Sequence, residues 1–368
     1  MSAAVVELFR ELAAIPSPSC HEGLVADRVQ DELGGVGLEA EVQPLDGTRT
    51  GNLLVRLPAT APGVPLLFCA HLDTVPPDGP LDPVVEDGVV RNAGGTILGA
   101  DDKAAVAVLL AAIRGVVEDG RPHAGLEILF TCQEEIGLQG SKAFDFGRLD
   151  AEAGFVFDDA SPVGTVVVAA PFQENVLVTF RGRASHAGLA PEDGRSAIVA
   201  AARAVAAMPN GRLDPETTAN VGVISGGVAR NVVAAECRIE ADVRSYEAGR
   251  ARGLVPELLE HCSAAATSVG CAVESETFEG YPGYRLRPDD LPVRLAADAL
   301  RRCGLEPELI SSGGGVDANV INARGIPTAN LGNGMAHIHT SDETIATADL
   351  VAMVDVALAL IQTAAATG

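Results

Sequence analysis

The stretch of sequence that determines the fold reads Pro65-Leu66-Leu67-Phe68-Cys69-Ala70-His71-Leu72-Asp73. Its apolar part has the length of a β-strand and is typical of a strand buried in an α/β sheet. The run ends in a histidine and a carboxylate. Two further apolar runs have the same form, since residues 126–132 lead to Glu134 and residues 154–157 lead to Asp158. Because open α/β sheets build their sites at the carboxyl ends of strands, the three runs together predict a functional site there.

On both sides of this stretch the sequence alternates strand-like and helical runs, the pattern of a mostly parallel sheet with helices on both faces. The clearest helix in residues 1–172 is Lys103–Val117. The same texture returns from about residue 284, with helices predicted at Leu291–Cys303 and Leu350–Thr363 and a strand at Thr328–Leu331. Residues 1–172 and 284–368 are therefore predicted to form one α/β domain.

Between these two parts the texture changes to alternating strands and two long helices. The predicted elements are strands at 175–180, 218–224, 232–243 and 271–278 and helices at 196–208 and 247–269. We expect residues 173–283 to form an α+β domain with a four-stranded antiparallel sheet and two helices, inserted into the first domain at exposed loops.

Composition limits the class of protein. A chain of 368 residues is long for a single core, which favours two domains. The net charge of -24 makes nucleic acid and anionic membrane surfaces improbable partners. Hydrophobic residues make up 47% of the chain, so disorder is excluded.

Cysteine usage and apolar runs indicate a cytoplasmic protein. The seven cysteines show no Cys-x-x-Cys spacing, so disulfides are not expected. Residues 2–15 form an amphipathic pattern without the basic start and apolar stretch of a signal peptide. No run approaches the roughly 20 apolar residues of a membrane span, and the nearest, Ala104–Ile113, is predicted to be a core helix.

Three other strings carry residues of the types that bind metals: Gly99-Ala100-Asp101-Asp102-Lys103, Gln133-Glu134-Glu135 and His337-Ile338-His339. In the first, Asp102 can cap the helix that follows while Asp101 faces a site. A carboxylate has two oxygens and can bridge two cations, which a histidine cannot. In the 71–73 string, extended geometry puts His71 and Asp73 on one side, where Asp73 can orient a metal-bound imidazole. An ordinary turn is the alternative for that string.

Adjacent carboxylates after a buried strand repel each other unless cations or solvent neutralise them. Glu134-Glu135 is therefore either a solvated loop pair or part of a cation site. Chemistry at such a site needs one carboxylate on the metal and one free to take a proton from water. The residues themselves leave open which glutamate does which.

Together these strings resemble those of the peptidase T-like branch of the di-zinc exopeptidases, a superfamily that also includes carboxypeptidases, aminoacylases and succinyl-diaminopimelate desuccinylase. The similarity extends from Pro16-Ser17 to His339-Thr340-Ser341-Asp342-Glu343, nearly the whole chain. It implies a zinc-binding catalytic domain formed by residues 1–172 and 284–368, and a lid or dimerisation domain formed by residues 173–283.

The resemblance also implies roles for individual residues. Asp101 would bridge two zinc ions, with a cis peptide bond to Asp102, and Glu134 would be the general base. Asp159 stands where relatives often have glycine and is an alternative ligand to Asp158. His337 is expected to lie beside the site or in a plain loop. The implied metal ligands are His71, Asp101, Glu135, Asp158 and His339. This mixture of nitrogen and oxygen ligands suits catalytic zinc, with cobalt or manganese possible.

The inserted domain contributes His186, Asn231 and Arg244. The resemblance implies that His186 reaches the site of the partner subunit and stabilises an oxyanion, and that Asn231 and Arg244 bind substrate, Arg244 through a carboxylate. A structural histidine and a surface salt bridge are the alternatives. In the loop 312–317, backbone N–H groups, Gly314 among them, can bind an anion; a tight turn is the alternative. Peptidase T proper has arginine in place of Ser312, which leaves tripeptide specificity open.

The function predicted from the sequence is that of a cytoplasmic, homodimeric di-zinc exopeptidase acting on small peptides. A metal-bridging hydroxide would attack the carbonyl, with Glu134 as general base and Asp73 orienting His71. The alternative enzyme is an aminoacylase that cleaves N-acyl amino acids with the same site. The alternatives from other classes are a catalytically silent peptide-binding scaffold and a nucleotide-binding α/β protein, although no Gly-x-Gly-x-x-Gly string is present.

Overall fold

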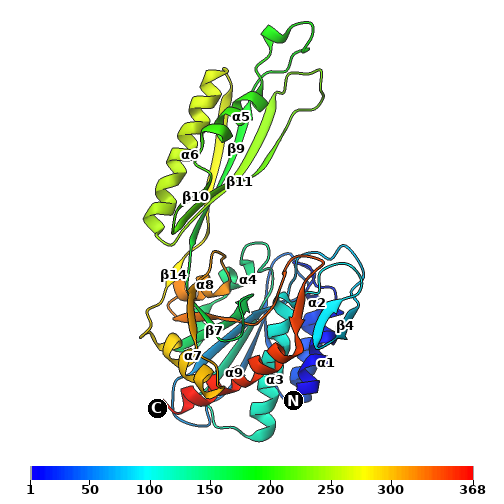
Figure 1. Cartoon of the computed structure of the whole chain (residues 1–368), viewed down its shortest axis with the longest axis vertical. Helices are drawn as coiled ribbons and strands as arrows, with labels where there is room; N and C mark the ends of the chain where they lie inside the picture. The colour runs from blue at the N-terminus through cyan, green and yellow to red at the C-terminus, as the bar shows by residue number, and fades with distance from the viewer. Residues whose placement is uncertain (1, 368) are drawn as a thin grey trace. The chain divides into compact units, whose positions relative to one another are not determined.

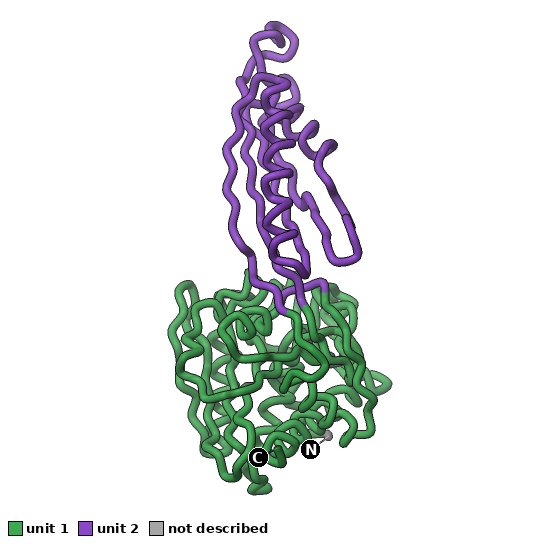
Figure 2. The backbone as a smooth tube through the Cα atoms, turned by 90° about the vertical axis from the view of Figure 1, so that its left-hand side faces the viewer, with its two compact units in different colours: residues 1–169, 285–312, 316–368 green, residues 170–284, 313–315 purple. Residues whose placement is uncertain are grey.

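The computed structural model describes residues 2–367. The chain forms two compact units (Figure 2). Unit 1 comprises Met1–Ala169, Arg285–Ser312 and Val316–Gly368, and unit 2 comprises Ala170–Tyr284 and Gly313–Gly315.

The central element of unit 1 is a nine-stranded sheet (Figure 1). Its strand order is β1 (Glu41–Pro44), β2 (Gly51–Leu57), β6 (Leu126–Thr131), β3 (Leu66–His71), β7 (Ala153–Asp159), β16 (Thr328–Gly332), β8 (Thr165–Ala170) and β14 (Tyr284–Arg285), with β15 (Glu308–Ser311) paired to β8. Strands β6, β3, β7 and β16 run parallel to one another. Strands β3 and β6 are buried along their whole length, as expected for apolar runs covered on both faces.

Helices cover both faces of this sheet. They are α1 (Ser2–Ala13), α2 (Gly23–Gly35), α3 (Ala100–Asp119), α4 (Gln139–Ala143), α7 (Leu291–Arg302), α8 (Asp317–Ala323) and α9 (Thr347–Ala365), with a short 3-10 turn at Phe146–Arg148. Helix α7 packs on β7, β16 and α9, whereas α8 packs on the same two strands and on α4. The small antiparallel sheet β17-β5-β4 (Thr344–Ala346, Val89–Asn92 and Pro83–Glu86) completes unit 1.

Helix α9 is long and apolar enough to cross a membrane by length and composition, and 61% of its most apolar window is buried within the fold. It packs on α3, α7 and α1, as the core helix of a globular unit does. The segment most similar to a membrane span is therefore α9 and not residues 104–113. Asp349 and Asp355 interrupt the apolar run of α9 in the sequence, but the helix as a whole remains apolar. All seven cysteines are free, as the sequence predicts.

Unit 2 is an antiparallel sheet with two helices packed on one face. The strand order is β10 (Gly211–Asp214), β11 (Thr217–Gly226), β12 (Glu236–Ser245), β9 (Phe172–Arg181) and β13 (Ala272–Tyr281), and the helices are α5 (Ala197–Ala207) and α6 (Ala248–Ser268), with a 3-10 turn at Pro191–Asp193. The core forms between sheet and helices, with Val178, Phe180 and Ile239 from the strands against Leu254 and Leu258 from α6.

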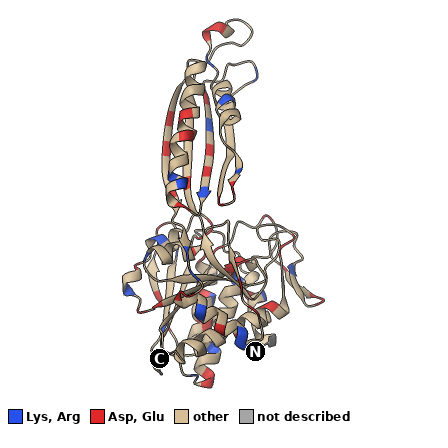
Figure 3. Cartoon of the chain, turned by 60° about the vertical axis from the view of Figure 1, so that its left-hand side comes forward, with Lys and Arg blue, Asp and Glu red and all other residues tan. Residues whose placement is uncertain are grey.

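The α/β and α+β classes of the two parts are confirmed, with two differences in detail. The antiparallel sheet has five strands and not four, because the short β10 pairs with the start of β11. Residues 313–315 group with unit 2 and not with the 284–368 segment. The reason is local packing, since Arg244 Nη1 donates to Gly313 O at 3.1 Å and Gly315 lies against the ring of Tyr281 with no room for a Cβ. Acidic and basic side chains are interspersed over each unit (Figure 3).

Candidate metal centre

Three neighbouring strands bring the predicted ligands to one edge of the sheet. His71 is the last residue of β3 and pairs with Thr131, the last residue of β6. Glu134 and Glu135 follow β6, and Asp158 lies at the end of β7, on the other side of β3. The strand order β6-β3-β7 therefore places the ends of all three apolar runs side by side, as the sequence predicts.

Asp101 joins two halves of this cluster through its two carboxylate oxygens. Oδ1 lies 3.0 Å from His71 Nε2, and Oδ2 lies 3.1 Å from His339 Nε2. Each histidine also faces a second carboxylate. His71 Nε2 lies 3.9 Å from Asp158 Oδ2, and His339 Nε2 lies 3.0 Å from Glu135 Oε1. The result is two sets of nitrogen and oxygen donors that share one carboxylate. The peptide bond between Asp101 and Asp102 is cis.

The spacing of these atoms fits metal ions. Donor atoms bound to a tetrahedral ion at 2.0–2.2 Å are roughly 3.3–3.6 Å apart, and the separations here run from 3.0 to 3.9 Å. Single atoms of His71, Asp101 and Glu135 lie within 4.8 Å of one another, as do those of Asp101, Asp102 and Asp158. The residues present therefore fit a pair of divalent cations.

The charges in the cluster strongly perturb its acids and bases. Burial opposes the charged imidazolium of His71, but Asp101 and Asp73 outweigh it and hold the pKa of His71 well above its ordinary value. Hydrogen bonds that the imidazolium of His339 donates to Asp101 and Glu135 raise the pKa of His339 to about 10. Burial, reinforced by the neighbouring Asp101, raises the pKa of Asp158 well above its usual range. Carboxylates gathered at this density call for cations to balance them.

Asp73 contacts the cluster through both its backbone and its carboxylate. His71 Nδ1 lies 2.9 Å from the backbone O of Asp73 and 3.6 Å from its carboxylate. The carboxylate, fully buried, accepts the backbone N–H groups of Glu134 at 2.9 Å and of Glu135 at 3.1 Å. Asp73 thus orients the imidazole through its main chain and the glutamate pair through its side chain.

Glu134 and Glu135 differ in surroundings. The carboxylate of Glu135 faces His339, whereas that of Glu134 has no hydrogen-bond partner among residues 2–367. Burial, reinforced by Asp158, Asp317 and Glu135, raises the pKa of Glu134 well above its usual range. An unpartnered carboxylate of raised pKa can accept a proton, and a carboxylate on a histidine can hold a cation.

The alternative ligands differ in their surroundings. Asp159 Oδ1 accepts the N–H of Ser161 at 2.9 Å in a turn, whereas Asp158 faces His71. The exposed His337 makes no contact with the cluster carboxylates among the described residues. Asp102 precedes the regular part of α3, but its Oδ2 accepts the N–H of His71 at 3.2 Å and no helix amide.

Two residues without a role in the sequence analysis hold the predicted ligands in place. Glu343, nearly fully buried, accepts the N–H groups of Leu98 and Gly99 at 2.8 Å and of Asp101 at 3.1 Å. Asn330 accepts the N–H of Asp158 at 2.9 Å and donates to its O at 2.6 Å. Glu343 lies in the string 339–343, and Asn330 lies inside an apolar strand, where a polar side chain is the signal that could have marked it.

The predicted residues of unit 2 lie in two places within that unit. His186 forms a bridge with Val232, and the N–H of Ala187 donates to the O of Asn231 at 3.0 Å, so His186 and Asn231 lie on adjoining loops. Both side chains are exposed. Arg244 Nε donates to Asp242 at 2.7 Å. Arg244 lines a pocket of about 300 Å³ with Arg212, Asn220, Tyr246 and Gly313, next to Gly314 of the predicted anion-binding loop.

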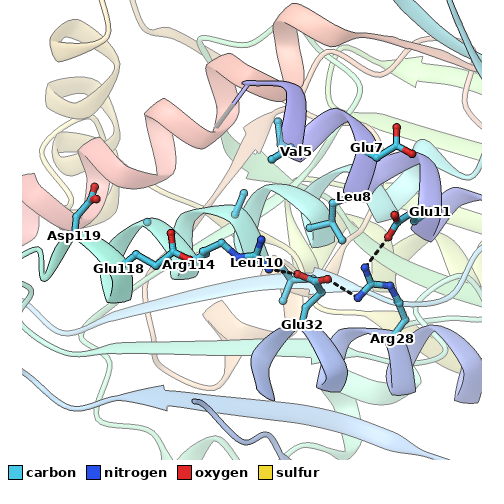
Figure 4. Close-up of a pocket in the computed structure, with 13 residues that line it drawn as sticks. Val5, Glu7, Leu8, Glu11, Arg28, Glu32, Leu110, Arg114, Glu118 and Asp119 are labelled. Atoms are coloured by element: carbon cyan, nitrogen blue, oxygen red, sulfur yellow. Dashed lines mark hydrogen bonds and ion pairs between the residues drawn. The ribbon is translucent and has the colours of Figure 1, made fainter. Parts of the chain in front are cut away.

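A separate pocket of about 350 Å³ lies between α1, α2 and α3 (Figure 4). Ion pairs form among the residues that line it: Arg28 pairs with Glu11 at 2.6 Å and with Glu32 at 2.5 Å, and Arg114 also pairs with Glu32. None of the predicted site residues lines this pocket. Its charged pairs hold three helices together and have no part in the metal centre.

Comparison with known proteins identifies the class that this fold and site define. The family model described as Peptidase family M20/M25/M40 matches residues 67–363. The structure of aminopeptidase PepT from Bacillus cereus ATCC 10987 is similar with a TM-score of 0.90 and 38% identity, covering 99% of each chain. The structure of a tripeptidase from Staphylococcus aureus subsp. aureus Mu50 gives a TM-score of 0.94 and 33% identity, covering 100% of this chain and 99% of the other. The uncharacterized protein YqjE of Bacillus subtilis (strain 168) is 38% identical over 98% of both chains.

The chain belongs to the M20/M25/M40 peptidase family. Within it, the chain is a peptidase T-like metallopeptidase, as the sequence motifs predict. This family depends on a dinuclear metal centre, and the cluster around Asp101 offers the groups to hold one.

Proposed function

We propose that this metallopeptidase holds two zinc ions in the cluster around Asp101 and cleaves terminal peptide bonds of small peptides. The observation that carries the proposal is the pair of Asp101 oxygens, one 3.0 Å from His71 and the other 3.1 Å from His339. His71 and Asp158 would hold one ion, His339 and Glu135 the other, and Asp101 both. Cobalt or manganese would fit the same donors.

When bound, the ions would polarise the scissile carbonyl and acidify the attacking water. Glu134 takes the proton from that water and delivers it to the leaving amine, a task that its free carboxylate and raised pKa support. Asp73 keeps Glu134 and Glu135 in place through their backbone N–H groups and keeps the imidazole of His71 oriented.

The substrate is proposed to be a small peptide with a free terminus. Relatives with the names aminopeptidase PepT and tripeptidase support this class. In unit 2, Arg244 presents a guanidinium in a pocket of about 300 Å³, which suits the carboxylate of a peptide. Asn231 and the N–H groups around Gly314 are proposed as further substrate contacts. An N-acyl amino acid has the same amide and carboxylate and is the competing substrate class.

The test is a mass-spectrometric screen of the purified protein against dipeptides, tripeptides and N-acyl amino acids, with elemental analysis of the same sample. We expect about two zinc ions per chain, loss of activity on chelation and its return with zinc. Cleavage confined to N-acyl amino acids would replace the peptidase proposal with the aminoacylase. One metal or none in fully active protein would exclude the two-metal site.

We further propose that the protein is a cytoplasmic homodimer in which His186 of one chain serves the metal site of its partner. Strand β10 pairs with β11 only at residues 217–219, which leaves residues 222–226 of β11 as an edge with no second strand among the described residues. Along this edge Val223 and Ile224 are exposed. Such an edge favours pairing with a second copy.

Complementation tests this arrangement. Inactive His186→Ala and Glu134→Ala chains are unfolded together and refolded, so that statistical mixing produces heterodimers. If His186 acts in trans, a mixed dimer contains one intact site and one site lacking both groups, and about a quarter of wild-type activity returns. Mixed dimers without recovered activity would place His186 in its own chain's site or outside catalysis.

A further inference from the structure

Two buried carboxylates anchor three consecutive amides of the turn that carries the glutamate pair. Asp73 accepts the N–H groups of Glu134 and Glu135 at 2.9 and 3.1 Å. Glu22 Oε1 accepts the N–H of Gln133 at 3.1 Å. The turn from 133 to 135 is therefore held along its whole backbone by acids that come from other parts of the chain.

The turn needs such support because of its backbone conformation. Gln133 has a φ of 59°, in the left-handed region that residues other than glycine seldom adopt. A residue held there persists only when its surroundings fix it. The N–H of Gln133 points at Glu22, and its side-chain Nε2 donates to Asp46 O at 2.9 Å.

Glu22 is built into its place by more than this contact. It is fully buried, and the same Oε1 accepts the N–H of Cys20 at 2.9 Å. The other oxygen accepts the hydroxyl of Thr48 at 2.8 Å. Ser19, in the same loop, donates to Asp73 Oδ2 at 2.7 Å. One short segment, residues 19–22, thus supplies or supports both carboxylates that hold the turn.

We propose that Glu22 is a positioning residue for hydrolysis. By holding the amide of Gln133 it sets the direction in which Glu134 and Glu135 leave the sheet edge, and so the placement of the base and of one metal ligand. This inference rests on the proposed roles of those two glutamates. A charged acceptor holds an amide about twice as strongly as a neutral one, yet the role requires an oxygen at the right distance and not the charge itself.

Two substitutions of Glu22 distinguish the effect of its oxygen position from the effect of its charge. Glu22→Asp keeps the charge and withdraws the oxygens by one methylene, out of reach of Gln133. Glu22→Gln keeps an oxygen for both N–H groups, and its amide nitrogen can donate to the Thr48 hydroxyl. Positioning predicts that kcat falls about 10–100-fold in Glu22→Asp with KM little changed, because displaced supporting groups cost that much. In Glu22→Gln, kcat should stay within about threefold of wild type, because the hydrogen bonds remain.

Glu127→Asp is the matched control. Glu127 is buried, lies at the opposite end of β6, and its Oε2 accepts the N–H groups of Asp150 and Ala151 at 2.9 and 3.0 Å. Its shortening removes the same kind of contact from the same sheet, far along the strand from Gln133. Stability against denaturant should fall as in Glu22→Asp, while kcat stays at the wild-type level.

Zinc affinity, measured by competition with a chelating dye, gives a readout that needs no turnover. Because the turn that Glu22 holds carries Glu135, the Glu22→Asp variant should bind one zinc ion about tenfold more weakly. The zinc affinity of Glu127→Asp should match that of wild type. The proposal is overturned if Glu22→Asp and Glu127→Asp behave alike in kcat and zinc affinity, or if Glu22→Gln loses as much as Glu22→Asp. Wild-type protein that binds two zinc ions and cleaves no amide would instead overturn the proposed function, with the zinc series still testing Glu22.

Discussion

Replacing Glu343 with glutamine should disturb both proposed metal sites, although Glu343 is not one of the proposed ligands. Glu343 Oε2 accepts two N–H groups, from Leu98 and Gly99, and Oε1 accepts that of Asp101 at 3.1 Å. The amide oxygen of glutamine can keep the first two bonds. Its NH2 group then faces the backbone N–H of Asp101, donor against donor. The substitution therefore removes a hydrogen bond that positions Asp101, whose carboxylate is proposed to bridge both ions.

The size of the effect follows from the three bonds. Leaving the Asp101 amide without an acceptor costs about 1–3 kcal/mol. The other two bonds change from a charged to a neutral acceptor and weaken by about 1 kcal/mol each. The free energy of unfolding should therefore fall by about 3–5 kcal/mol in total, which most domains survive because their stability is about 5–15 kcal/mol.

The assay combines three measurements on one preparation: denaturant unfolding, zinc per chain after dialysis, and kcat with zinc in excess. We expect the stability loss above, fewer than two retained zinc ions, and a kcat reduced about 10–100-fold. Glu127→Gln serves as the control, since its contacts lie at the other end of β6. If Glu343→Gln loses the expected stability but keeps two tightly bound ions and wild-type kcat, Glu343 supports the fold alone and the reasoning is refuted.

Three other predictions test the metal centre. Glu134→Gln should keep its zinc and lose orders of magnitude in kcat, because the amide cannot accept a proton, whereas Glu135→Gln should lose zinc; the opposite pattern would exchange the two roles. The pKa of His339 is raised to about 10, so its imidazole is protonated at neutral pH without metal, and the pKa of His71 is shifted in the same direction. Zinc binding should therefore release protons and weaken as the pH falls, which calorimetry in buffers of different ionisation enthalpy measures; binding without proton release would contradict this. Asp158→Asn should lower the zinc content, because Asp158 faces His71. Asp159→Asn should leave it unchanged, because the carboxylate of Asp159 accepts a hydrogen bond within a turn; elemental analysis of both variants measures the zinc content.

Much of unit 1 could be predicted because its signals are local. The run before His71 is apolar without interruption, and the structure buries every residue of β3. The predicted ends of the helix after Asp102 and of the two helices in unit 2 lie within a few residues of the observed ends of α3, α5 and α6. The strand predicted to begin at Val232 instead begins at Glu236, because Val232 and Val233 pair with the loop of His186 and Ser185. Alternation of apolar residues does not distinguish a sheet strand from such a bridge.

The supporting acids could not be predicted in the same way. The chain has 50 acidic residues, and nothing local distinguishes Glu22 and Glu343, both buried, from a solvated glutamate. Glu22 accepts a hydrogen bond from an N–H group 111 residues away in the sequence, and Glu343 accepts hydrogen bonds from N–H groups more than 240 residues away. Their role exists only once distant segments meet.

The sequence by itself determined which residues can bind metal and where strands end, because apolar length and residue chemistry are properties of short segments. His71, Glu134, Glu135 and Asp158 could be named from that information. The tertiary structure alone decided that β6, β3 and β7 are neighbours and that Asp101 turns one oxygen to each histidine. It also decided which of the many carboxylates hold backbone amides. Pairing order and burial depend on contacts between distant segments, and the free energy of a buried carboxylate is set by the donors that surround it.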